Sequence, residues 1–237
     1  MIKIHPLNVG TITRPMSAFG YAFERKVIDV PVIAWYIEGL DKKILVDTGG
    51  GDPAKAPFRA APYKREREQT LESTLGKIGV SCEDIDIVLV THLHWDHCGD
   101  NDLFPKAKYI IQREELETAR SPFPITAEGY NRKMVDEVDY TVVSGDKKIA
   151  NGVKVIFAPG HSFGFQQVLV ETEKKRILIA GDNISFFKNL EQDPPLISGY
   201  YVDLKAYYKG LEKMARLKAD VILPGHDSRV FEKEFYN

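Results

Sequence analysis

Three histidines and one aspartate fall close together in the segment Thr91-His92-Leu93-His94-Trp95-Asp96-His97. The segment follows the apolar run from Ile85 to Val90, which has the length and composition of a buried strand. Imidazole nitrogens and carboxylate oxygens are the ligands of zinc and similar divalent ions. Without a metal, so many polar groups at the end of a buried strand would lack hydrogen-bond partners. The segment therefore predicts a metal site.

The local backbone decides which of these four side chains can share one site. If the strand continued through the segment, the alternating side chains of His92, His94 and Asp96 would point to one face. His97 would join them only if the chain turned at that point.

Three further apolar runs each end at a small turn that presents one metal-capable side chain. The run ending at Phe157 leads through Ala158-Pro159-Gly160 to a histidine, and the other two lead to an aspartate and a histidine; the three side chains are His161, Asp182 and His226. A single case would most often be a turn residue or a histidine with ordinary hydrogen bonds. Together with the first segment, they assign five of the six histidines in the chain to one site.

The elements that must position these residues are mostly strands. Apolar runs rich in β-branched residues predict strands at 30–37, 43–46, 85–90, 108–111, 153–157, 167–170, 176–180 and 221–223. Segments of helical period predict helices at 71–78, 113–120 and 204–215, the last with Asp203 as its N-cap. This pattern indicates an α/β protein with packed sheets. The stretches 49–63 and 186–201 are expected to be long loops, either contacting a substrate or simply connecting elements at the surface.

Composition excludes several classes of protein. The 237 residues are 43% hydrophobic and 28% charged, which is ordinary for a globular chain and suits a single domain over residues 1–237. The net charge of −2 gives no indication of the positive surface that would bind nucleic acid or an anionic membrane. Two cysteines make no disulfide framework, and no apolar run approaches the roughly 18 residues of a membrane span, so we expect a cytoplasmic protein.

The ordered set His92-x-His94-x-Asp96-His97, His161, Asp182 and His226 resembles the metallo-β-lactamase fold superfamily. Ile44-Leu45-Val46-Asp47-Thr48-Gly49 also resembles the second-strand motif of that family. The resemblance covers most of the chain, from about residue 30 to 228. It implies an αββα sandwich of the metallo-β-lactamase type, with the metal site at one edge of the two sheets. It also implies two divalent metal ions, which we expect to be zinc, with iron, cobalt and manganese as alternatives.

The family pattern assigns each ligand to one of the two ions. One metal is held by three histidines: His92, His94 and His161. The other is held by Asp96, His97 and His226, and the carboxylate of Asp182 bridges the two. Asp47 is expected either to orient a ligand through a hydrogen bond or to be a turn residue before Gly49-Gly50.

Within the superfamily the residues favour hydrolases. Flavodiiron oxidoreductases carry Glu where this chain has His94, and β-lactamases proper usually lack a histidine at the place of His97 and carry Cys at that of Asp182. Lactonases, glyoxalase II-like thioesterases and mononuclear iron persulfide dioxygenases remain as candidates, while a non-enzymatic scaffold would not need a complete ligand set. The layout most resembles the N-acyl homoserine lactonases, through Val30-Pro31-Val32, residues 160–166 and Gly225-His226-Asp227. This implies a small acyl substrate, and a homodimer is compatible with it.

The lactonase resemblance implies opening of a lactone or related cyclic ester by a metal-bridging hydroxide. Asp96 is expected to pass a proton to the leaving group. Those lactonases typically place a tyrosine three residues after the bridging aspartate, where this chain has Ser185, which either donates to the substrate carbonyl or is a structural hydroxyl. The next two residues, Phe186 and Phe187, are expected either to wall an apolar substrate pocket or to pack in the core.

Overall fold

The computed structural model describes residues 1–56 and 62–237. One sheet contains seven strands: β1 (Lys3–Pro15), β2 (Val27–Glu38), β3 (Ile44–Val46), β4 (Tyr63–Lys64), β5 (Ile87–Leu89), β6 (Lys108–Gln112) and β7 (Tyr140–Val143). The other contains five: β8 (Lys147–Ala150), β9 (Val153–Phe157), β10 (Gln166–Glu171), β11 (Arg176–Gly181) and β12 (Val221–Pro224). The helices are α1 (Leu71–Lys77), α2 (Trp95–Cys98), α3 (Arg113–Arg120), α4 (Arg132–Val135) and α5 (Leu204–Leu217).

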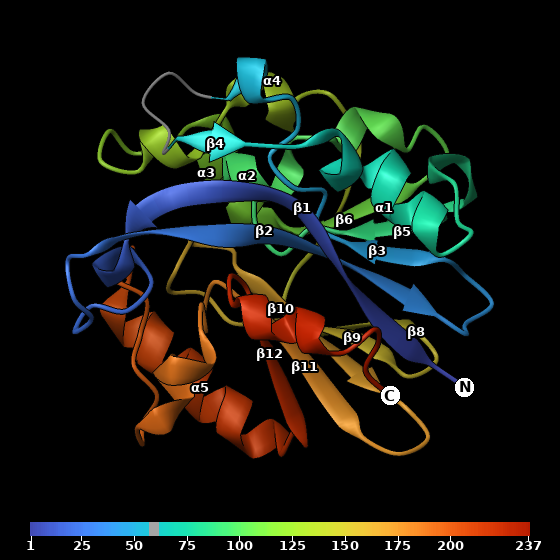
Figure 1. Cartoon of the computed structure of the whole chain (residues 1–237). Coiled ribbons are helices and arrows are strands. Elements are labelled where there is room, and N and C mark those ends of the chain that lie inside the picture. The colour runs from blue at the N-terminus through green and yellow to red at the C-terminus, as the bar shows by residue number, and fades with distance from the viewer. Residues whose placement is uncertain (57–61) are drawn as a thin grey trace.

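The two sheets pack face to face with helices on both outer sides (Figure 1). The strand order is β4-β1-β2-β3-β5-β6-β7 in the first sheet and β12-β11-β10-β9-β8 in the second. Helices α1 to α4 lie on the side of the first sheet, and α5 covers the second (Figure 1). The predicted αββα sandwich is therefore confirmed.

Side chains that point alternately to the two faces of each strand explain this layering. In β3, the side chains of Ile44 and Val46 lie between the sheets, whereas Leu45 packs with the helices over the first sheet. In β11, Ile177 and Ile179 lie between the sheets, and the intervening residues face α5. Because both faces of these strands are covered, the runs are almost continuously apolar.

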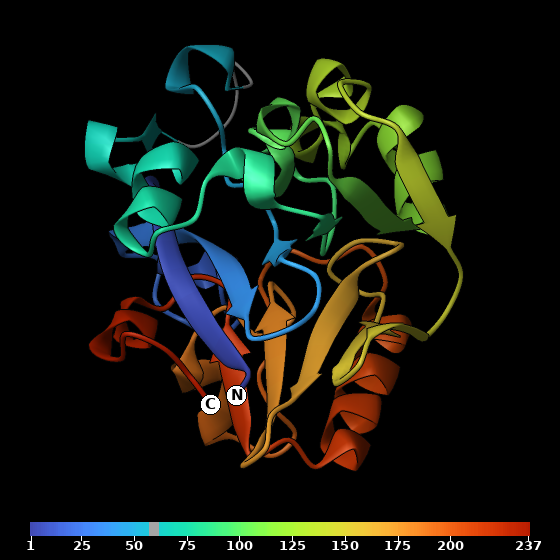
Figure 2. The ribbon, with the colours of Figure 1, turned by 90° about the vertical axis from the view of Figure 1, so that its right-hand side faces the viewer.

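Helix α5 forms where the sequence predicts a helix. The side chain of Asp203 accepts a hydrogen bond of 2.8 Å from Ala206 N, which caps the first turn of α5. Tyr207, Leu211 and Met214 are spaced along one face and pack against the second sheet. The N- and C-termini lie side by side (Figure 2), where Ile4 and Tyr236 exchange backbone hydrogen bonds of 2.9 Å.

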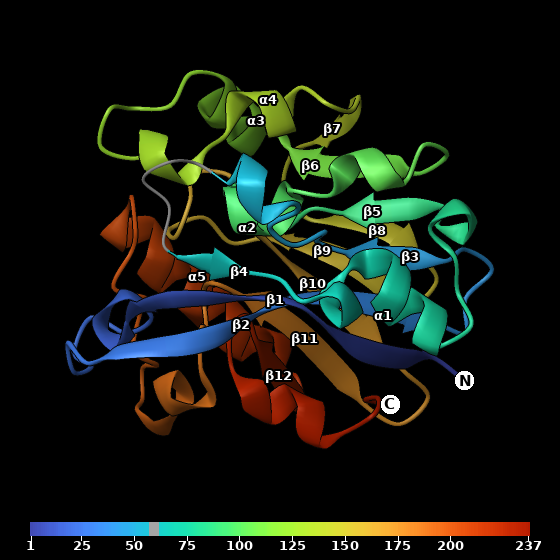
Figure 3. The same cartoon turned by 45° about the horizontal axis from the view of Figure 1, so that its top comes forward.

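The structure adds strands that the sequence patterns did not predict. The longest, β1, pairs with β2 along its whole length to form an antiparallel ribbon (Figure 3). β7 and β8, at the edges of the two sheets, were also not predicted. Residues 57–61 of the predicted loop 49–63 lie outside the described part of the chain. In the described part, none of the helices has both the length and the apolar character needed to cross a membrane.

Candidate metal centre

The predicted ligands come together where several strands end. β5 ends at Leu89, and the chain then turns into the single-turn helix α2, so the strand does not continue through the histidine segment. This turn lets His97 join His92, His94 and Asp96 in the site. Three other chain segments, after β9, β11 and β12, supply the remaining side chains: His161, Asp182 and His226. All seven residues are buried, none of them more than 9% exposed.

Three histidines form one half of the cluster. His94 Nδ1 lies 2.9 Å from His92 Nε2 and 3.2 Å from His161 Nε2. Their ligand atoms all fall within 4.8 Å of one another, so one ion can contact all three. A set of three imidazoles is a common ligand set for zinc.

The other half of the cluster contains Asp96, His97 and His226, whose ligand atoms also lie within 4.8 Å of one another. Asp182 lies between the halves. Its Oδ1 is 3.3 Å from His97 Nε2 and 3.2 Å from His226 Nε2, while its Oδ2 is 3.4 Å from His161 Nε2 and 3.3 Å from His226 Nε2. One carboxylate therefore reaches both sets of ligands.

Groups behind the histidines fix which ring nitrogen faces the site. His161 Nδ1 lies 3.0 Å from the carbonyl oxygen of Tyr200, and His226 Nδ1 lies 2.9 Å from that of Pro31. A carbonyl oxygen only accepts, so both Nδ1 atoms must carry the proton. Each Nε2 then presents a lone pair to the cluster, the form in which imidazole binds a metal.

Asp47 orients His97 in a similar way. Its Oδ2 lies 2.8 Å from His97 Nδ1 and accepts from Thr91 Oγ1 at 2.7 Å, while its Oδ1 accepts from Thr91 N at 2.7 Å. The Asp47 backbone adopts φ +60°, in the left-handed region that costs energy for a residue with a Cβ. Thr91 Oγ1, whose proton points to Asp47, is left to accept from His92 Nδ1 at 3.1 Å.

The donor atoms of the cluster suit a divalent cation. In the described part of the chain, His97 Nε2 and Asp182 Oδ1 lie 3.3 Å apart, and both are buried without a hydrogen-bond partner, which an ordinary polar cluster would avoid. Burial places the pKa of His92 and His94 well below their ordinary value, so both are neutral. Burial alone would raise the pKa of Asp182, but His226 and His97 hold it well below its ordinary value. Neutral His92 and His94 and an ionised Asp182 are the protonation states that metal binding needs. Asp182 raises the pKa of His97 and His226 against the effect of burial, so these two rings must lose a proton when an ion binds.

Sequence patterns did not reveal Glu115, a fully buried glutamate on α3. Its Oε1 accepts from Leu93 N at 2.9 Å, and its Oε2 accepts from Ser162 Oγ at 2.6 Å and Gly164 N at 3.0 Å. It thereby ties the loop of His94 to the loop of His161. Burial raises the pKa of this carboxyl group, against the effect of its donors. In the sequence it looks like any other charged residue of a surface helix.

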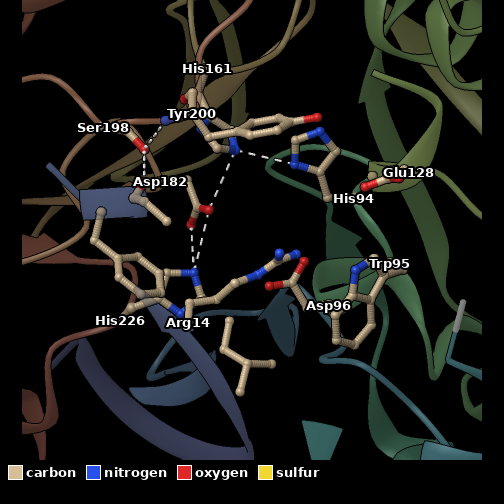
Figure 4. Close-up of a pocket in the computed structure, with 14 residues that line it drawn as sticks. Arg14, His94, Trp95, Asp96, Glu128, His161, Asp182, Ser198, Tyr200 and His226 are labelled. Carbon is tan, nitrogen blue, oxygen red and sulfur yellow. Dashed lines mark hydrogen bonds and ion pairs between the residues drawn. The ribbon is translucent and has the colours of Figure 1, made fainter. Parts of the chain in front are cut away.

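An open cavity of about 670 Å³, including its mouth, lies over the cluster. Figure 4 shows five of the predicted ligands facing it, namely His94, Asp96, His161, Asp182 and His226. The remaining lining comes mainly from β1, the following turn and two loops: Ile12, Arg14, Ala18, Phe19, Trp95, Glu128, Gly129, Ser198 and Tyr200. The 186–201 stretch thus contributes to the cavity through Ser198 and Tyr200.

The three predicted substrate contacts after Asp182 lie outside this lining. Ser185 is buried, and its carbonyl oxygen accepts from His226 N at 2.9 Å, so its main chain helps to position His226. The ring of Phe186 packs behind Phe19, with 5.0 Å between ring centroids. The ring of Phe187 lies against the guanidinium of Arg229.

Comparison with known proteins agrees with this geometry. The family model of the metallo-beta-lactamase superfamily matches residues 27–226. An N-acyl homoserine lactonase of Bacillus cereus is 28% identical over 211 residues, covering 85% of this chain and 83% of the relative. The N-acyl homoserine lactonase AiiB of Agrobacterium fabrum is 27% identical over 229 residues, covering 87% and 83%.

Solved structures give the same result. A variant of B. thuringiensis AiiA with N-decanoyl-L-homoserine bound at the active site superposes with a TM-score of 0.83 and 26% identity, covering 97% of this chain and 95% of that one. An N-acyl homoserine lactone hydrolase with the product N-hexanoyl-L-homoserine bound at its catalytic metal centre superposes with a TM-score of 0.83 and 25% identity, again covering 97% of this chain and 95% of that one. The αββα fold, the clustered His and Asp side chains and the match over most of its length show that this chain belongs to the metallo-β-lactamase superfamily.

Proposed function

We propose that this protein is a dinuclear-metal-dependent hydrolase that opens a lactone of the N-acyl homoserine lactone kind or a related cyclic ester. His92, His94 and His161 would hold one ion, and Asp96, His97 and His226 the other. Lactonases are the named activity of the relatives that match most of the chain, so a thioesterase or a persulfide dioxygenase is not favoured.

The observation that carries the proposal is the position of Asp182. Its Oδ1 lies near His97 and His226 and its Oδ2 near His161 and His226, all at 3.2–3.4 Å. The carboxylate thus reaches histidines of both halves of the cluster and can be shared between two ions. Zinc suits the nitrogen and oxygen donors. When bound, a pair of divalent ions supplies a Lewis acid for the ester carbonyl and lowers the pKa of water toward neutrality.

The chain itself binds and orients the ester. Asp96 belongs to the cluster and also lines the cavity. Its carboxylate is therefore placed to take the proton that the attacking water gives up and to pass it to the leaving alkoxide.

Tyr200 is the residue we assign to the carbonyl contact, because the Ser185 hydroxyl does not line the cavity. Its ring lies against His94 and His161, with centroid distances of 5.6 Å and 5.8 Å. Tyr200 N donates to Ser198 Oγ at 3.2 Å, and that hydroxyl donates to Ala18 O at 2.9 Å, which fixes the loop.

The test is to measure metal content and hydrolysis on one preparation. N-hexanoyl homoserine lactone, a glutathione thioester and a β-lactam are offered to the purified protein, with and without chelator. We expect about two ions per chain, rapid opening of the lactone, and loss of that activity with chelator. Fully loaded protein that opens no lactone would refute the proposal, and preference for the thioester would move it to the thioesterase class.

A further inference from the structure

A charged side chain from β1 lies in the wall of the metal cavity. Ile12 and Arg14 both line it, as expected for side chains two positions apart on a strand. Thr13 points the other way, where its hydroxyl donates to Asp29. Figure 4 shows the long side chain of Arg14 extending among the residues that face the cluster.

Arg14 has no partner of opposite charge within the part of the chain that the structure describes. Its guanidinium forms no hydrogen bond or ion pair with residues 1–56 or 62–237. Asp96 lines the same cavity, but its ion-pair contact is with His97 Nε2, at 3.9 Å. The other acidic side chain in the wall, Glu128, is exposed and comes from a separate turn, Ala127–Gly129.

A guanidinium in this position favours an anionic ligand. It is always charged, and its planar set of donors matches a carboxylate through two parallel hydrogen bonds. A charge held in a partly enclosed cavity loses hydration, which an ion pair with a ligand would offset. The lining contains apolar or neutral residues, among them Ile12, Ala18, Phe19 and Ser198, as well as the carboxylates of Asp96, Asp182 and Glu128.

We propose that Arg14 binds a carboxylate carried by the acyl part of the substrate, so that the preferred lactones are acidic. This rests on the proposed lactone opening, which places the ester at the ligand cluster. Arg14 belongs to β1, which supplies none of the predicted ligands, so its guanidinium would be available to the acyl part of a substrate whose ester lies at the cluster. An acyl chain that is purely hydrocarbon would leave the charge of Arg14 without a partner.

The experiment compares matched acidic and neutral substrates with the metal-loaded enzyme. N-succinyl homoserine lactone carries a carboxylate, and N-succinamoyl homoserine lactone has a neutral amide of nearly the same shape. The N-glutaryl lactone and its neutral amide are one methylene longer, and they test whether a longer acyl chain places the carboxylate closer to Arg14. We expect kcat/KM to be at least about 10-fold higher for the better acidic substrate than for its amide, as for a charge-assisted hydrogen-bonded pair.

Variants assign any such preference to one residue. Arg14→Met keeps much of the side-chain volume, and it should lower kcat/KM for the acidic lactone about 10- to 100-fold and change the neutral one by less than about 3-fold. Arg14→Lys should retain part of the preference, because it keeps the charge but not the planar fork. The matched control is Arg25→Met, which removes an exposed charge outside the cavity lining and should change neither substrate.

Equal kcat/KM for the acidic and neutral lactones, or an equal loss of both in Arg14→Met, would overturn the inference. A second readout separates this from failure of the proposed function. The matching γ-lactams are not esters, and their binding can be followed by the fluorescence of Trp95, which lines the cavity. If no lactone is opened, the proposed function fails. Tighter binding of the acidic lactam that disappears in Arg14→Met still supports the role of Arg14, and equal binding of both lactams refutes it.

Discussion

The histidines of the cluster differ in what orients them, and this decides how mutation can affect each one. The Nδ1 atoms of His161 and His226 point at main-chain carbonyl oxygens, which substitution does not remove. His97 instead relies on the carboxylate of Asp47. These main-chain partners cannot be recognised in the sequence, because they come from Tyr200 and Pro31, far along the chain from the histidines they orient. The residue types of the site and the hydrogen bond to Asp47 were predictable, whereas the main-chain partners of His161 and His226 were not.

Asp47→Asn is expected to weaken metal binding by about 10- to 100-fold with little loss of fold. The carboxylate accepts from three donors, and an amide would turn its NH₂ group toward at least one of them. Competition with a chromogenic chelator measures the affinity. Asp139→Asn, which changes an exposed aspartate, is the control and should bind metal normally. Unchanged affinity in Asp47→Asn would leave Asp47 as a turn residue only.

Tyr200→Phe is expected to lower kcat for lactone opening by about 10-fold while metal content stays the same. The change removes only the hydroxyl, and the carbonyl that orients His161 remains. A single oxyanion contact removed elsewhere costs about 10²–10³ in kcat, and a partly exposed phenol should contribute less. Steady-state kinetics with parallel metal analysis measures both quantities. If kcat did not change, Tyr200 would be a wall of the cavity and not a contact to the carbonyl.

Among the elements, the short helix α2 depends on a close approach to the loop after β3. Gly99 N donates to Gly49 O at 2.7 Å, and Thr48 N donates to His97 O at 2.9 Å. A Cβ on Gly99 would lie 2.2 Å from the carbonyl carbon of Gly50, so only glycine allows this contact. The glycine-rich sequence after Asp47 therefore serves to seat the helix that carries two of the predicted ligands.

Gly99→Ala is expected to lower the free energy of unfolding by about 1–3 kcal/mol, because backbone has to move to admit the methyl group. The metal content should fall as well, since Asp96 and His97 are on α2. The control is Gly76→Ala in α1, where a Cβ would meet nothing within 4 Å. That change should stabilise the protein by roughly 0.5–1 kcal/mol, since alanine favours a helix. Chemical denaturation compares the two, and equal stability would contradict the packing argument.

Most strands that end at the site were predictable, because they are buried on both faces and carry continuous apolar runs. β1 was not, because its alternation is broken by a bulge between Asn8 and Gly10 and it contains Pro6 near its start. Because β1 was not predicted, the position of Arg14 in the cavity was not predicted either. The edge strands β7 and β8 are only partly buried, so their sequences lack a strong pattern.

At the scale of the whole molecule, the proposed metal ligands come from both halves of the sandwich. The four residues of the 92–97 segment follow a strand of the first sheet, and His161, Asp182 and His226 follow strands of the second. A metal held by both groups would link the two sheets at one edge. The cluster contains two carboxylates and five histidines. These side chains are not held together in the unfolded chain, so metal binding favours the folded state.

Removing metal is therefore expected to lower Tm by about 5–10 °C. Ligand at 100-fold above its Kd stabilises the folded state by about 2.7 kcal/mol, and 1 kcal/mol corresponds to roughly 2–4 °C for a chain of this size. Thermal unfolding followed by circular dichroism, before and after dialysis against chelator, measures the shift. Re-added zinc should restore Tm, and chelator already saturated with zinc should have no effect. An unchanged Tm after verified metal loss would mean that the sheets do not depend on the ions.

The most direct test of the central claim is stepwise reconstitution of stripped protein. Zinc is added in fractions of an equivalent, and the initial rate of N-hexanoyl homoserine lactone opening is measured at each step. The expected result is no activity without metal, a rise that ends at about two equivalents per chain, and no recovery in Asp182→Ala. Opening of the lactone without metal, or a protein that holds two equivalents and opens none, would contradict the proposal.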